Sequence, residues 1–270
     1  MISFYLMLLA AGLVGGFMAG LLGIGGGVVF VAILPLVLRH VGIPEDQIVQ
    51  YTIANSIFGT WFASFSANSN LIRHKEFHWK EVAWIGLGSS VFSLSVLRFI
   101  VNTPLYSKEA FNVIIIGLLL FVLVQTLRKA RKILLSTPEI KSTPTLLVAG
   151  ASGGTVAALS GLGGGTIIIP ILHLVLKMDI KKAKSISLGV IFITTSIITI
   201  NNLLENTLLL NTINHTGYIV WSVALPLSFG VMLSSSLGVK VGRMISSKSI
   251  SYIFATFILL VIIQKLADLL

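Results

Sequence analysis

The stretch Gly23-Ile24-Gly25-Gly26-Gly27 decides the fold of this chain, because the second half repeats it as Gly161-Leu162-Gly163-Gly164-Gly165. Each copy lies inside a long apolar run without formal charge, 2–38 and 145–176. A glycine cluster interrupts a helix, and at membrane depth the freed backbone groups are tolerated only where they are buried in protein or line a cavity. Transporters commonly build a substrate site from such broken helices. The pattern therefore predicts a duplicated membrane protein with a binding site at the two breaks.

The composition indicates a polytopic membrane protein. Of the 270 residues, 55% are hydrophobic and 10% are charged, which leaves too little polar material for a soluble surface. The formal charge is +10, but the 19 Lys and Arg residues are scattered over short loops between apolar spans. Membrane topology explains such a distribution, so we expect the lipid bilayer and no nucleic acid as a partner. The chain has no cysteine, which excludes disulfides and thiolate sites, and we expect neither a metal nor a cofactor.

The division of basic residues distinguishes two topologies. Six ordinary spans are predicted at 51–67, 82–101, 110–127, 185–204, 217–239 and 250–266. If each glycine-interrupted run crosses once, Lys and Arg divide almost evenly between the two sides. If each run is a hairpin, they divide 15 to 4, and only Arg39, Arg98, Lys108 and Lys265 lie opposite the majority. A large asymmetry is typical of an oriented membrane protein, which favours hairpins.

The expected fold is an all-α polytopic membrane protein of two inverted repeats, each a glycine-broken helical hairpin followed by three transmembrane helices. The first repeat is 1–127 with its hairpin at 2–38, and the second is 145–270 with its hairpin at 145–176. A basic linker, 128–144, is expected in the cytoplasm, with both termini outside. The N-terminus lacks a positive region and a cleavage site, so we interpret it as a retained first helix of a bacterial inner-membrane protein. The second arms, 28–38 and 166–176, either cross the membrane or re-enter.

Beyond the glycines the repeat is weaker. A shift of 138 aligns the two clusters, and a shift of 134 aligns 52–58 with 186–192 mainly through a shared Ile-Phe.

The doubled Gly-x-Gly-Gly-Gly, followed by an apolar run, a proline, a loop and a Ser/Thr-bearing helix, resembles the TauE/SafE sulfite exporter family. The second copy through Pro170 is similar to the family pattern, whereas Ala32 stands where the first copy would carry the proline. The resemblance implies transport of small sulfur-containing anions such as sulfite or organosulfonates, often outward.

The residues themselves also favour an anion. All nine acids lie in predicted loops or at span ends, so no carboxylate is expected at the membrane centre to bind a cation. A small anion needs only converging N–H and O–H donors, and glycine backbone at half-helix N-termini supplies them with a favourable dipole.

The candidate substrate-binding groups come from the breaks and from the helix that follows each hairpin: Gly25, Gly26, Gly27, Asn55, Ser56, Ser160, Gly163, Gly164, Gly165, Thr166, Ser187, Thr194 and Thr195. The alternative for the glycines is close helix packing, and for Asn55 an interhelical hydrogen bond. The hydroxyls can instead bond back to their own helices. His173, expected near membrane depth, is a candidate proton sensor or a neutral hydrogen-bonded histidine.

Three mechanisms fit the sequence to different degrees. We expect a carrier, and not an enzyme, that holds a small-molecule anion at the breaks and works by alternating access. A passive anion channel built on the same glycines is the alternative. An intramembrane serine protease using Ser152, within Gly150-Ala151-Ser152-Gly153, is a distant third, because His173 and His215 lack the glycine spacing that such a histidine needs. A homodimer is a candidate assembly, and the sequence leaves the oligomeric state open.

Overall fold

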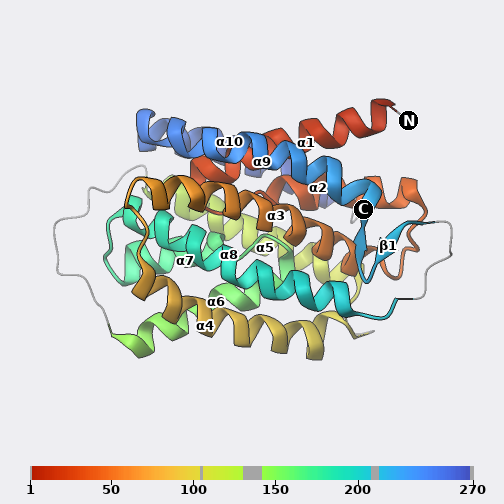
Figure 1. The fold of residues 1–270 in the computed structure, drawn as a ribbon, viewed down its shortest axis with the longest axis horizontal. Coiled ribbons are helices and arrows are strands. Elements are labelled where there is room, and N and C mark those ends of the chain that lie inside the picture. The colour runs from red at the N-terminus through yellow and green to blue at the C-terminus, as the bar shows by residue number, and fades with distance from the viewer. Residues whose placement is uncertain (1, 104–105, 130–141, 208–212, 268–270) are drawn as a thin grey trace.

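The computed structural model describes residues 2–103, 106–129, 142–207 and 213–267. Within them the chain forms long helices that lie side by side along the longest axis of the molecule (Figure 1). In the first half these are α1 (Ile2–Leu22), α2 (Gly27–Val41), α3 (Ile48–Arg73), α4 (Trp79–Val96) with a π-helical continuation η1 (Leu97–Val101), and α5 (Lys108–Lys129). In the second half they are α6 (Thr143–Ser160), α7 (Gly165–Pro170) with η2 (Ile171–Val175), α8 (Ile180–Leu204), α9 (Trp221–Met244) and α10 (Ser247–Ala267).

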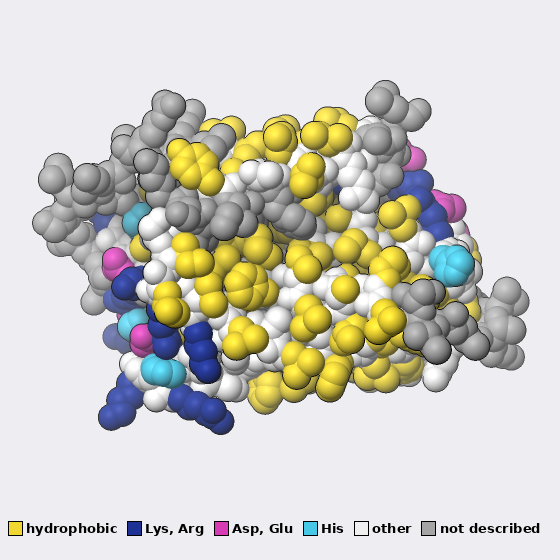
Figure 2. Space-filling view, turned by 90° about the horizontal axis from the view of Figure 1, so that it is seen from above, with side chains coloured by type: hydrophobic (Ala, Val, Ile, Leu, Met, Phe, Trp, Pro, Cys, Tyr) yellow, Lys and Arg dark blue, Asp and Glu magenta, His cyan; other side chains and the backbone are white. Residues whose placement is uncertain are grey.

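The surface and the helix lengths confirm the all-α polytopic class. Four described segments are long and apolar enough to cross a membrane: Phe4–Leu22, Trp79–Val101, Ile180–Leu204 and Trp221–Met244. Large apolar side chains such as Leu87, Phe92 and Phe229 are about half exposed. Figure 2 shows hydrophobic side chains as a broad yellow band between two ends that carry charged side chains. A soluble monomer rarely exposes so much contiguous apolar surface, whereas a bilayer covers it.

The predicted spans match helices α3, α4, α5, α8, α9 and α10, with one correction. The span expected at 217–239 begins later, at Trp221. It is preceded by a short antiparallel hairpin of β1 (His215–Thr216) and β2 (Ile219–Val220). Gly217 adopts a left-handed φ of +54° in the turn, and a β-carbon there would lie 1.9 Å from the Asn202 carbonyl oxygen. The apolar residues of this segment therefore cover the end of α8 instead of extending a helix.

Each glycine-interrupted run turns back on itself. Gly15 of α1 contacts the ring of Phe30 in α2, and Gly153 of α6 contacts Ile168 in α7. The second arms are short: α2 has 15 residues and extends about 22 Å. The α7–η2 arm, Gly165–Val175, extends about 16 Å. Both fall short of the roughly 30 Å hydrocarbon core, so neither arm is long enough to cross it alone.

Small residues allow the helix pairs with the most extensive contacts to pack closely. Helix α1 packs along α9, and α4 packs along α6, while α3 and α8 pair in the centre. A β-carbon on Gly20 of α1 would lie 2.0 Å from the Ser235 carbonyl oxygen of α9. A β-carbon on Gly154 of α6 would lie 2.1 Å from the Ser89 carbonyl oxygen of α4. Such close backbone approach is how small residues stabilise helix pairs in a membrane.

Charged side chains gather at the two ends of the molecule. At one end Arg243 pairs with Glu76 at 2.8 Å, and Lys182 pairs with Glu81 at 3.5 Å. The first pair joins the last turn of α9 to the loop after α3, and the second joins the first turns of α8 and α4. Figure 2 shows dark blue side chains gathered at one end of the molecule. At the other end Arg39 and Lys108 lie beside Glu45. Seven of the nine acids fall in described residues, and all seven lie in loops or at helix ends.

Candidate functional site at the two helix breaks

The two glycine clusters, far apart in sequence, touch each other inside the helix bundle. A β-carbon on Gly27 would lie 2.5 Å from the Leu162 Cα atom. One on Gly165 would lie 2.7 Å from the Ile24 Cα atom. All residues of 23–27 and 161–165 are buried. The glycines therefore serve close packing, and the same packing brings two interrupted backbones to one place.

Glycine is required at the breaks because the backbone turns through left-handed conformations there. The φ angles are +75° at Gly23 and +83° at Gly25, and +81° at Gly163 and +79° at Gly164. Residues with a side chain are strained in this region, whereas glycine adopts it readily. These turns end α1 and α6 and start α2 and α7.

The turns leave backbone donors without partners. Within the described residues, the amide nitrogens of Gly25, Gly26, Gly163 and Gly164 donate no hydrogen bond to another protein group. They precede the N-terminal ends of α2 and of the α7–η2 arm, where aligned peptide dipoles give a partial positive charge. A buried N–H without a partner costs free energy, and an anion would satisfy it.

Two serines tie the breaks to the central helices in a reciprocal way. Ser56 of α3 donates a 2.7 Å hydrogen bond to the carbonyl oxygen of Gly161 in the second break. Ser187 of α8 donates a 3.0 Å hydrogen bond to the carbonyl oxygen of Gly23 in the first break. Each half thus holds the break of the other half. In this structure both hydroxyl protons are committed to the protein.

Thr60 of α3 lies between the two breaks, and the sequence analysis missed it. Its methyl carbon would lie 2.8 Å from a β-carbon on Gly25 and 2.8 Å from one on Gly163. Its hydroxyl is fully buried and has no hydrogen-bond partner within the described residues, and the same holds for the predicted site residue Thr166. The available signal was spacing, because Thr60 follows Ser56 by one helical turn and so lies on the same face.

A lysine lies beside the first break. The side chain of Lys184 packs against Gly23, and its Nζ atom is 3.4 Å from the carbonyl oxygen of Leu21. In the hairpin topology Lys184 is one of the 15 basic residues on the majority side, and its position in the sequence gave it no further role. The structure adds that this cation lies within one helical turn of Ser187 and beside Gly23, the first residue of the first break.

The other predicted hydroxyl and amide groups are occupied away from the contact between the breaks. Asn55 donates to the carbonyl oxygens of Tyr51 and Tyr218 and accepts from the Val220 amide, which fixes the β1–β2 hairpin on α3. Thr194 donates to the Ser89 hydroxyl at 2.7 Å, and Thr195 donates to the carbonyl oxygen of Ile191 in its own helix at 2.7 Å.

Ser160 and His173 cap local structure. The Ser160 hydroxyl donates to the Val156 carbonyl oxygen and accepts from the Leu162 amide, which shapes the exit from α6. His173 lies on η2, and its Nδ1 atom is 2.8 Å from the Met178 carbonyl oxygen. Its role as a proton sensor stays a prediction.

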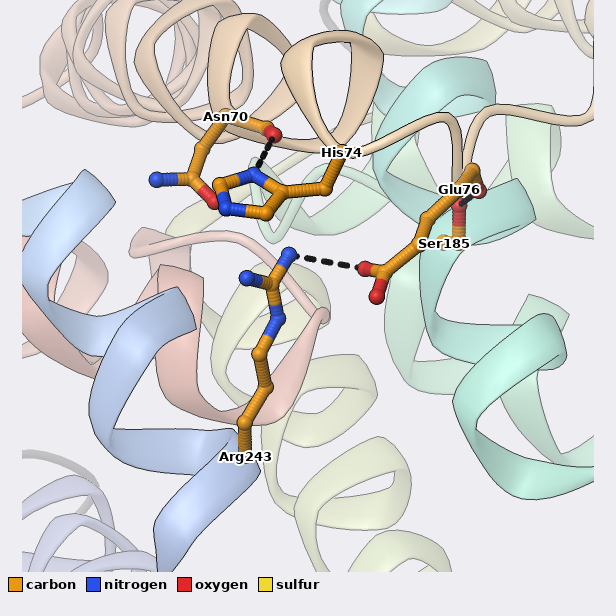
Figure 3. Close-up of polar contacts among 5 residues, drawn as sticks. All are labelled: Asn70, His74, Glu76, Ser185 and Arg243. Atoms are coloured by element: carbon orange, nitrogen blue, oxygen red, sulfur yellow. Dashed lines mark hydrogen bonds and ion pairs between the residues drawn. The ribbon is translucent and has the colours of Figure 1, made fainter.

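The end of the molecule that carries Arg243 and Lys182, called the basic end below, contains a polar network near the first break (Figure 3). The Ser185 hydroxyl donates to the carbonyl oxygen of Glu76, whose carboxylate pairs with Arg243. Nearby, His74 donates from Nδ1 to the Asn70 carbonyl oxygen at 2.8 Å. The network joins α3, α8 and α9 at the end where the Lys184 side chain lies.

Neither a protease site nor a metal centre is assembled in the described part of the chain. The Ser152 hydroxyl donates back to the Val148 carbonyl oxygen at 3.0 Å. No histidine there forms a hydrogen bond with it, and no group of three or more His, Asp or Glu side chains could hold a metal ion.

A bundle of apolar helices with two buried backbone breaks at its centre defines a helical membrane transporter. Residues 8–264 match the family described as "Sulfite exporter TauE/SafE", and the chain belongs to this family. It is 31% identical over 257 residues to "Probable membrane transporter protein MJ0441" of Methanocaldococcus jannaschii, covering 93% of this chain and 91% of that protein. It is 24% identical over 271 residues to "Probable membrane transporter protein YunE" of Bacillus subtilis, covering 95% of each chain. No solved structure matches the chain.

Proposed function

We propose that the protein is a carrier that exports small sulfur-containing anions such as sulfite or organosulfonates. The observation that carries the proposal is the contact between the two breaks, where unpartnered amides lie beside the buried hydroxyls of Thr60 and Thr166. A tetrahedral or pyramidal oxyanion accepts several hydrogen bonds at once. It therefore matches a group of N–H and O–H donors that have no hydrogen-bond partner in the protein. The family description supports the sulfur anion.

The proposed electrostatics favour a negative ligand. Lys184 contributes a cation beside the first break, and the described acids lie at the ends of the molecule. A membrane potential that is negative inside supplies about 2.3 kcal/mol per charge per 100 mV for moving an anion outward. Export therefore needs no coupling ion under this proposal.

The proposed mechanism is alternating access by two inverted repeats, 1–127 and 145–270. Reciprocal contacts between the two halves support it. The first helix of each half packs on a helix of the other half, α1 on α9 and α6 on α4. Ser56 of the first half bonds to the second break, and Ser187 of the second half bonds to the first break. These serines are 131 residues apart, which favours a shift of 131 over 134 for aligning α3 with α8. Rocking of the halves would move both breaks together, because each half holds the other's backbone.

The proposed orientation follows from the charges. The linker at 128–144 faces the cytoplasm together with the basic end, and both termini face outside an inner membrane. Residues 130–141 of this linker lie outside the described structure. The ends of the helices that flank it, α5 and α6, lie at the opposite end from the start of α1 (Figure 1).

Binding to purified protein tests the ligand class. A ligand that binds only the folded protein raises its melting temperature. We expect stabilisation by at least one of sulfite, thiosulfate, sulfoacetate and taurine, and none by acetate at equal ionic strength. Equal shifts with all anions would indicate a salt effect and contradict the proposal. A passive channel would instead give flux that rises without saturation, and the complete burial of both breaks argues against such an open pore.

A further inference from the structure

At the basic end, ion pairs join the first half of the chain to the second. Glu76, in the loop between α3 and α4, pairs with Arg243 in the last turn of α9 at 2.8 Å. Glu81, in the first turn of α4, pairs with Lys182 in the first turn of α8 at 3.5 Å. In the mechanism proposed above one half moves against the other, so contacts between the halves favour one arrangement over another. These pairs favour the arrangement in which the halves meet at the basic end.

The elements that carry these pairs border the first break. Lys184 of α8 packs against Gly23, the first residue of the break. At the end of α9, a β-carbon on Gly242 would lie 3.2 Å from the carbonyl oxygen of Leu21 in α1. All residues of 23–27 are buried. An anion that approaches from the basic end therefore reaches the break only when the surrounding elements move apart.

Glu76 connects the start of α8 to the end of α9 through two different groups (Figure 3). Its carboxylate accepts a hydrogen bond from the Arg243 guanidinium group of α9. Its backbone carbonyl oxygen accepts a hydrogen bond from the Ser185 hydroxyl of α8. One residue of the first half thus holds two helices of the second half beside the break.

The end of α3 fixes the position of Glu76. The Glu76 amide donates to the carbonyl oxygen of Leu71 at 3.0 Å, and the Lys75 amide donates to that of Ile72 at 3.1 Å. Lys75 adopts a left-handed φ of +58° at a helix-ending position that glycine usually occupies. This pair of backbone hydrogen bonds ends α3 in a defined turn, so the two groups of Glu76 are held toward α8 and α9.

We propose that Glu76 is the latch of a gate at the basic end. While its carboxylate binds Arg243 and its carbonyl oxygen binds Ser185, α8 and α9 stay together over the first break, and access from this end opens when both contacts release. The Glu76 and Arg243 side chains are partly exposed, so water replaces their contact during opening. The gate rests on the proposed alternating access. Its test follows the entry of a reagent and not the transport of sulfite, so it does not depend on the substrate.

Access of a thiol reagent to the breaks tests the gate. The chain has no cysteine, and the buried Thr60 lies between the two breaks, so Thr60→Cys provides a single reporter. A membrane-impermeant methanethiosulfonate is added to vesicles that expose the basic end, which the exposed thiol of a separate Lys181→Cys protein identifies. We expect slow modification in the Thr60→Cys protein, and about fivefold faster modification when Glu76→Gln or Arg243→Gln is added. Exchanging the charges, Glu76→Arg with Arg243→Glu, should restore the slow rate.

Lys240→Gln provides the matched control, because Lys240 is an exposed cation one turn before Arg243 on the same helix. It should leave the rate of modification unchanged. Ser185→Ala removes the second contact and should also raise the rate; it keeps the test valid if the charge variants do not fold. A slow rate that neither these variants nor Glu76→Gln raise above that of Lys240→Gln would overturn the gate alone. Fast modification of the Thr60→Cys protein from both sides of the membrane would overturn both the gate and the carrier.

Discussion

At the scale of single residues, the breaks are specified by glycine conformation and by the hydroxyls around them. Gly163 and Gly164 adopt left-handed φ angles, and a β-carbon on Gly164 would lie 2.4 Å from the Gly153 carbonyl oxygen. Substituting such a glycine disturbs the fold and the ligand site together. The hydroxyls separate the two roles better, because a Thr→Val change preserves shape.

Thr60→Val should weaken anion binding without unfolding the protein. The hydroxyl has no protein partner in the described structure, so its loss breaks no internal hydrogen bond. We expect a loss of about 1 kcal/mol for one hydrogen bond to the ligand, roughly fivefold in affinity. Titration calorimetry with sulfite measures it. Thr195→Val, whose hydroxyl bonds only within α8, should bind as the parent does. Equal losses in both variants would remove Thr60 from the site.

Glu45 predicts a limited pH dependence of stability. Its folded-state pKa is lowered, because hydrogen bonds from Lys108 and Arg39 outweigh the effect of burial. A lowered pKa stabilises the folded state above the unfolded value and loses this contribution as the pH falls through the folded value. The melting temperature of the parent should therefore exceed that of Glu45→Gln at pH 7. The difference should close below pH 4.5; a constant difference down to pH 3 would contradict the assignment.

At the scale of helices, the sequence predicted which helices exist and their order along the chain, but it predicted some helix ends less accurately. Hydrophobic length located the spans, and the charge division favoured hairpins over single crossings. The start of α9 was predicted four residues too early, at Gly217. The backbone of Gly217 packs against Asn202 in a turn, and hydropathy carries no information about such a contact. Thr60 and Lys184 were missed for a similar reason: only the contact between the two breaks makes them neighbours.

Glycines in the helix pairs should be intolerant where backbones touch. Gly154→Ala places a methyl group 2.1 Å from the Ser89 carbonyl oxygen, so α4 and α6 must separate. We expect a clear fall in melting temperature or in the yield of folded protein. Gly117→Ala in α5 is the control, because nothing lies within 4 Å of the added carbon. Its melting temperature should not fall. Equal stability of the two variants would contradict the packing described here.

At the scale of the whole molecule, two polar ends and an apolar band define how the protein sits in a bilayer (Figure 2). The reciprocal packing of the two halves gives the molecule one central contact between breaks and two unlike ends. Arg39 and Lys108 lie at one end and Lys184 toward the other. An anion moving outward would meet positive charge on both sides of the breaks.

Labelling from one side tests the orientation. The protein lacks cysteine, so Asp46→Cys and Lys181→Cys each carry one exposed thiol at opposite ends. A membrane-impermeant maleimide should label Asp46→Cys in intact cells. It should label Lys181→Cys only in inverted vesicles. The reverse pattern would place the basic end outside and contradict the proposed topology.

The most direct measurement is efflux of sulfite from proteoliposomes loaded over a range of concentrations, with an imposed potential and without a sodium or proton gradient. The account predicts efflux that saturates with concentration, accelerates when the interior is negative, and falls in Thr60→Val but not in Thr195→Val. Efflux that rises linearly without saturation, or that requires a sodium or proton gradient, would contradict a carrier driven by the membrane potential through the two breaks.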